Sequence, residues 1–119
     1  MRLALRLAIP ALIAGATAIA CASTAPSSTG AAPAKAAVAI KGFAFSPTTL
    51  EVTKGTIVTF TNSDSAAHTV TSGANRTKDG KFDRQISGSA EDSITFDTAG
   101  TFEYFCTIHS SMNAKIVVK

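Results

Sequence analysis

The chain of 119 residues has room for one compact domain and an export segment, but not for a second hydrophobic core. Its composition, 45% apolar and 16% charged, is that of a globular protein. The formal net charge of +3 falls to +1 once Arg2 and Arg6 of the leader are set aside (+3 − 2 = +1), and the lysines are scattered, which excludes a basic nucleic-acid-binding stripe.

Residues 1–20 are predicted to be a secretory signal peptide. Arg2 and Arg6 precede an apolar stretch that ends in small residues at Ala18-Ile-Ala20. Cys21 follows directly, and Ala18-Ile-Ala-Cys21 resembles a bacterial lipobox with Ala18 in place of the usual Leu. Lipidation of Cys21 and simple cleavage after an Ala-x-Ala site therefore both stay open. Either route predicts export to the bacterial periplasm or the outer cell surface.

Residues 21–36 are small, polar and proline-bearing, which predicts a flexible linker or tether before a domain at 37–119. Within that domain, apolar residues alternate with polar ones, as in half-buried strands. The alternating sets are Val38 and Ile40, Leu50 and Val52, Val58 and Phe60, Ile94 and Phe96, Phe102 with Tyr104 and Cys106, and Ile116 and Val118. Seven or eight short strands without helical periodicity predict an all-β, antiparallel sandwich or barrel. Most of the phenylalanines, together with Tyr104, are expected in its core.

The two cysteines do not form a convincing disulfide pair, although exported domains often use cysteines in this way. Cys21 lies at the end of the leader, whereas Cys106 falls on the inward face of a predicted strand. A lone thiolate held by a metal explains Cys106 better.

The run Cys106-Thr-Ile-His109-Ser-Ser-Met112 places three metal-binding side chains on one loop, and His68 lies well upstream at the start of a strand. A thiolate, two imidazoles and a thioether are the ligand set of a blue-copper electron-transfer centre. Each residue alone has a simpler interpretation, as a strand histidine, a small buried thiol or a core methionine. Their joint occurrence predicts a site for one copper ion.

Several segments together resemble the plastocyanin/azurin family of cupredoxins, over residues 38–119. They are Gly42-Phe-Ala-Phe-Ser-Pro47, Leu50-Glu-Val-Thr-Lys-Gly55, Val58-Thr-Phe-Thr-Asn62, His68-Thr-Val70 and Gly100-Thr-Phe-Glu-Tyr-Phe-Cys-Thr-Ile-His109. The two-residue intervals of the ligand loop are similar to those of amicyanin. The resemblance implies a cupredoxin-like Greek-key sandwich, a type 1 copper site, and one-electron shuttling between extracytoplasmic redox proteins.

The chain departs from that family pattern at two places. Thr69 stands where such proteins often carry Asn after the first histidine ligand, and it can donate one hydrogen bond between the ligand segments but not two. Ile108 and Ser110 stand where amicyanin has prolines. We therefore expect a less stiff ligand loop.

Other functions fit the ligand set less well. Methionine is a poor zinc donor, and a Cys–His hydrolase needs an exposed, activated thiolate, so an enzyme is not expected. A copper storage or delivery protein of the cell envelope stays open as the alternative. For electron transfer we expect a monomer that exchanges electrons through the ring edge of His109, with a docking patch at Ile108, Ala66 and Ala67.

Overall fold

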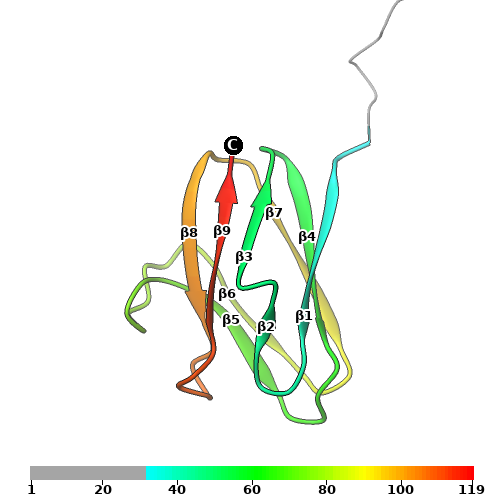
Figure 1. Cartoon of the computed structure of the whole chain (residues 1–119), viewed down its shortest axis with the longest axis vertical. Coiled ribbons are helices and arrows are strands. Elements are labelled where there is room, and N and C mark those ends of the chain that lie inside the picture. The colour runs from blue at the N-terminus through cyan, green and yellow to red at the C-terminus, as the bar shows by residue number, and fades with distance from the viewer. Residues whose placement is uncertain (1–31) are drawn as a thin grey trace, which may run out of the picture. The chain divides into compact units, whose positions relative to one another are not determined.

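The computed structural model describes residues 32–119, and this part of the chain forms nine strands and no helix (Figure 1). The predicted signal peptide at 1–20, Cys21 and most of the predicted linker lie outside the described residues. Within residues 32–119 there is accordingly no helix that could cross a membrane. The all-β class predicted from the alternating pattern is confirmed.

The strands follow one another in chain order with short connections. They are β1 (Lys35–Ile40), β2 (Phe45–Ser46), β3 (Thr49–Val52), β4 (Thr56–Asn62), β5 (His68–Ser72), β6 (Asp83–Ile86), β7 (Glu91–Phe96), β8 (Gly100–Phe105) and β9 (Asn113–Val118). β1 begins at Lys35, inside the predicted linker. The ninth strand, beyond the seven or eight expected, is the two-residue β2, which pairs with β1 through Ile40 and Phe45.

Two sheets make the sandwich, with strand orders β2-β1-β4-β7 and β3-β9-β8-β5-β6. Two pairings are parallel, β1 with β4 and β3 with β9, while the other pairings are antiparallel. The prediction of a purely antiparallel sandwich is wrong at these two places. Alternation along a strand reports which face is buried, but it does not report the direction of the neighbouring strand.

The core lies between the sheets and is built from the inward residues of each strand. In β4, Val58 and Phe60 are fully buried, while Thr59 between them is only half buried. From the opposite sheet, the ring of Tyr104 meets Phe45 at 4.8 Å and Phe60 at 5.6 Å between ring centroids, both edge-to-face. Burying each such side chain contributes about 1.5–3 kcal/mol. The scaffold that carries the site is therefore a well-packed one.

One phenylalanine lies outside the core. The Phe43 side chain is 49% exposed and lies in the turn between β1 and β2. Its backbone adopts φ 58°, beside Gly42 at φ 61°. This left-handed turn directs the ring away from the interior, which alternation cannot predict.

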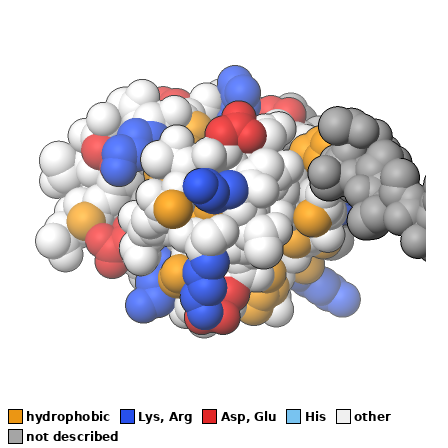
Figure 2. Space-filling model, turned by 90° about the horizontal axis from the view of Figure 1, so that it is seen from above, with side chains coloured by type: hydrophobic (Ala, Val, Ile, Leu, Met, Phe, Trp, Pro, Cys, Tyr) orange, Lys and Arg blue, Asp and Glu red, His pale blue; other side chains and the backbone are white. Residues whose placement is uncertain are grey.

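The turns β1–β2, β4–β5 and β8–β9 gather at the end of the sandwich opposite the C-terminus (Figure 1). Figure 2 views the other end, where positive, negative and apolar side chains are intermixed and no block of one charge forms. The candidate metal ligands all belong to the first of these two ends.

Candidate metal centre

Three side chains from two separate segments converge at the turn-rich end of the sandwich. The Nδ1 atoms of His68 and His109 are 3.0 Å apart, and the Cys106 Sγ lies 3.9 Å from the first and 3.6 Å from the second. Thiolate sulfur and imidazole nitrogen bind first-row metal ions at about 2.0–2.3 Å, which puts donor atoms around one ion roughly 3–4 Å apart. The three donor atoms therefore fit one ion.

His68 is held by the strand that it begins. It is the first residue of β5, pairs with Ile86 of β6, and has no exposed surface. The loop before it is shaped by Asn62, whose side-chain amide donates to the carbonyl of Ala66 at 2.8 Å and whose Oδ1 accepts the Asp64 N–H at 2.9 Å. The prediction that His68 starts a strand is confirmed.

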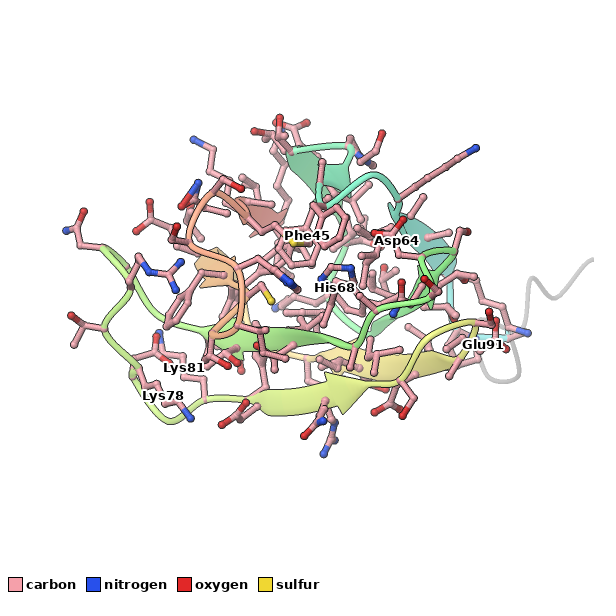
Figure 3. The ribbon with its side chains drawn as sticks, turned by 90° about the horizontal axis from the view of Figure 1, so that it is seen from below. Phe45, Asp64, His68, Lys78, Lys81 and Glu91 are labelled. Carbon is pink, nitrogen blue, oxygen red and sulfur yellow. The ribbon has the colours of Figure 1, made fainter. Side chains whose placement is uncertain are left out.

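Asp64 determines which nitrogen of His68 faces the site. Its Oδ2 lies 2.9 Å from His68 Nε2, and the carboxylate also accepts the backbone N–H groups of Gly42 at 2.8 Å and Phe43 at 3.0 Å (Figure 3). These hydrogen bonds, the one from Phe43 first, hold the pKa of Asp64 below its usual range. With the Nε2–H donated to an ionised carboxylate, the Nδ1 lone pair is left for a metal.

Phe43 covers the two imidazoles from outside. Its ring meets His68 at 5.4 Å and His109 at 4.8 Å between centroids, edge-to-face in both cases. A left-handed backbone costs a residue with a Cβ about 1–2 kcal/mol, and the hydrogen bond from the Phe43 N–H to Asp64 helps to offset this. The same carboxylate thus orients His68 and fixes its aromatic cover.

The loop from Cys106 to Met112 folds back on itself between β8 and β9. The Cys106 N–H donates to the Met112 carbonyl at 3.1 Å, and the Met112 N–H donates to the His109 carbonyl at 3.3 Å. Met112 is 1% exposed and belongs to the same buried cluster as Cys106, while His109 is half buried. The four predicted ligands are arranged as in a copper site, with three buried and His109 outermost.

The surroundings of Cys106 favour its thiolate form. Burial alone would raise the pKa of the thiol, but hydrogen bonds from the Thr69, His109 and Ile108 N–H groups and from the His68 ring lower the pKa to about 6. The Thr69 N–H lies 3.3 Å from Sγ. A thiolate at neutral pH is the form that binds metals.

Thr69 joins the histidine strand to the ligand loop. Its hydroxyl oxygen accepts the Thr107 N–H at 2.8 Å and lies 3.2 Å from the Thr107 hydroxyl. It also lies 3.0 Å from the hydroxyl oxygen of Thr71, which in turn donates to Asp83 at 2.8 Å. A side chain expected to donate one hydrogen bond thus also accepts one.

The predicted docking residues differ in exposure. Ile108 is 52% exposed, whereas Ala66 and Ala67 are half buried. The sequence interpretation missed Phe43 and Asp64 as parts of this end. The position of Asp64 four residues before His68, in a turn, was a local signal that could have found it. Nothing local marks Phe43.

Known proteins resemble the chain in sequence and in structure. A family model described as a cupredoxin-like domain matches residues 11–118. A purple cupredoxin from Nitrosopumilus maritimus has a TM-score of 0.64 and 26% identity, over 71% of this chain and 99% of that one. The Cu(I) form of an amicyanin variant has a TM-score of 0.64 and 30% identity, over 74% of this chain and 85% of that one.

An amicyanin from Paracoccus versutus, at 23% identity and a TM-score of 0.61 over 71% of this chain and 81% of that one, shows likeness of fold alone. No curated protein matches the sequence.

Proposed function

This chain belongs to the cupredoxin-like family, and on that premise we propose that it is a blue-copper carrier of single electrons between redox proteins. Its metal ligands are His68, Cys106, His109 and Met112. A copper ion held there would supply a one-electron couple between Cu(I) and Cu(II). The carrier itself makes and breaks no bond in a substrate, so it is not an enzyme.

The observation that carries this proposal is the spacing of the three strong donors, 3.0 Å, 3.6 Å and 3.9 Å, among residues of which two are completely buried. A centre whose donors are positioned by the fold changes little in geometry when its charge changes. Fast electron exchange requires this restriction. Storage or delivery of copper needs exchangeable ligands instead, and burial of Cys106 and Met112 disfavours that alternative.

Electrons enter and leave through the outermost ligand, His109. Its ring lies under Phe43 and beside the exposed Ile108, which are the exposed large hydrophobic residues of the described chain. Together with Ala66 and Ala67, these residues form the docking patch for a partner protein. Such an apolar surface lets a partner displace water and approach the ring edge closely.

The proposal extends to parts of the chain outside the described residues. A signal peptide at 1–20 and a tether that begins at Cys21 and ends before β1 would deliver a monomeric carrier outside the cytoplasm, with Cys21 as the lipid anchor if it is acylated. Mass spectrometry of the mature protein distinguishes acylated Cys21 from a cleaved terminus.

Copper loading with spectroscopy tests the centre. Cu(II) added to the purified protein should produce an intense visible charge-transfer band and a narrow parallel hyperfine splitting in EPR, because both arise from a covalent copper–thiolate bond. Cys106→Ser should abolish both signals, whereas Cys21→Ser is the matched control and should keep them. A colourless adduct, or one that Cys106→Ser leaves unchanged, would favour copper storage or delivery.

Electron self-exchange tests the route through the patch. Ile108→Ser and Phe43→Ser should slow self-exchange while leaving the visible spectrum intact, because they alter approach and not the ligands. Thr101→Val, at an exposed position of β8, is the control. Unchanged rates in both patch variants would exclude this surface.

A further inference from the structure

Arg76, which lies between β5 and β6, contacts the ligand loop at three backbone carbonyls. Its guanidinium donates to the carbonyl of Cys106 at 3.1 Å, to that of Ser110 at 3.1 Å and to that of His109 at 3.5 Å. The centre of the guanidinium also lies 5.3 Å from the centroid of the Phe105 ring. One side chain thus touches the last residue of β8 and both ends of the segment from Cys106 to Ser110.

The backbone that presents Arg76 is held in an unusual form. Asn75 and Arg76 both have positive φ, at 51° and 60°. The turn is closed by the Thr77 N–H, which donates to the Ala74 carbonyl at 2.9 Å, and is tied to β8 by the Gly73 N–H, which donates to Glu103 at 2.9 Å. Asn tolerates the left-handed region, whereas a long side chain rarely adopts it. The contacts of the guanidinium offset that unfavourable conformation.

The ligand loop has few backbone–backbone hydrogen bonds of its own. The run from Cys106 to Met112 contains no proline, and its internal backbone hydrogen bonds are the two that Met112 makes at the foot of the loop. The carbonyls of Cys106 and Ser110 instead accept hydrogen bonds from the Arg76 guanidinium. The planar fork of Arg can serve two acceptors at once with a fixed spacing, which the single ammonium of Lys cannot do.

We propose that Arg76 is a positioning residue that clamps the ligand loop and so fixes His109 relative to Cys106. The proposal rests on the proposed copper function for its consequence, but the clamp itself belongs to the metal-free protein. Residues that orient metal ligands without touching the ion typically alter metal affinity 10–100-fold when they are removed. Its positive charge beside the loop carbonyls also favours the more reduced state of the centre.

Amide hydrogen exchange of the metal-free protein tests the clamp directly. Arg76→Asn removes the guanidinium and keeps a residue that tolerates the left-handed backbone, so the fold should survive. We expect exchange at residues 107–111 to rise about tenfold or more, since exchange reports local opening, while β4 and β9 keep their protection. Arg76→Lys retains the charge and loses the fork, so it should resemble Arg76→Asn in this measurement.

Arg84→Asn is the matched control, because Arg84 is an exposed arginine of β6 whose partner Asp92 lies 3.6 Å away on β7. It should leave exchange at 107–111 unchanged. Equal exchange in wild type and Arg76→Asn, or an equal rise in Arg84→Asn, would overturn the clamp.

Copper extraction by a chelator then measures the consequence for the metal. Arg76→Asn should lose copper roughly 10–100-fold faster than wild type, and its reduction potential should fall. If exchange rises but copper extraction does not, the loop is clamped without effect on the metal and the positioning role is wrong. If wild type forms no copper–thiolate band at all, the proposed function fails, while the exchange result still decides the clamp.

Discussion

Three of the four ligand residues are buried, and the fourth is only half buried. His68 and Cys106 have no exposed surface and Met112 has 1%, whereas His109 is half buried on the loop. The inner three are fixed by strand pairing, by Asp64 and by packing. The outer one is held by the loop and by Arg76. Strand pairing and packing therefore position most of this centre, and His109 on the loop is the ligand that reaches the solvent.

The inner group should therefore matter to stability even without metal. Met112→Ala opens a cavity in the core and should lower the free energy of unfolding of the metal-free protein by about 2–5 kcal/mol. Met112→Leu fills the same space and should cost less than about 1.5 kcal/mol. Urea unfolding followed by circular dichroism measures both. Similar, small losses in the two variants would show that Met112 is not a packed core residue.

Substitutions of the two histidines should differ in their effect on the free energy of unfolding. His68→Ala leaves a buried gap and should cost the metal-free protein about 2 kcal/mol, whereas His109→Ala should stay within about 0.5 kcal/mol of wild type. Both should lose the visible band on addition of copper, because each removes a ligand. Equal losses in the free energy of unfolding would show that the buried and the half-buried ligand do not differ in their contribution to stability.

Thr69 links the strand that carries His68 to the ligand loop, and a substitution at this position should break that link. Thr69→Val keeps the shape but removes the oxygen that accepts the Thr107 N–H, which should cost about 1 kcal/mol. Thr101→Val, at an exposed position on β8, should cost little. Thermal unfolding compares the two substitutions, and a loss as large at Thr101 would remove the special role of Thr69.

The smallest expected effect is the loss of stability in acid that comes from Asp83, which accepts a hydrogen bond from the Thr71 hydroxyl. Lys78, and after it the Thr71 hydroxyl, lowers the pKa of Asp83. A carboxyl with a lowered pKa stabilises the fold above its ordinary pKa, near 3.9, and this contribution is lost as the pH falls through the folded value. Between pH 5 and pH 2.5 the urea midpoint of the metal-free protein should fall, and it should fall less in Asp83→Asn.

The sequence pattern was sufficient to predict those features whose physical cause lies among residues close together in the chain. Alternation predicted the all-β class, because inward residues recur at every second position of a strand. The alternating pattern predicted that one strand ends at Cys106 and the next begins at Lys115, with His109 and Met112 on the loop between them. In the structure β8 ends at Phe105 and β9 begins at Asn113. His68 at the start of β5 followed from its place between a turn and a β-branched run.

The rest depended on residues far apart in sequence. The parallel partners of β1 and β3, the outward turn at Phe43, and the contact of Asp64 with the β1–β2 turn depend on how the sheets meet. Arg76 illustrates this most clearly, because the carbonyls that it contacts are 30 to 34 residues away in the chain.

By itself the sequence determined which side chains could bind a metal and on which kind of strand or loop each stands, because donor chemistry and period-two burial are properties of the residues themselves. Only the tertiary structure decided that the donor atoms come within 3.9 Å of one another, which nitrogen of His68 faces them, and which ligand meets the solvent. Those distances are determined by the packing of two sheets, and packing joins residues that no local pattern relates.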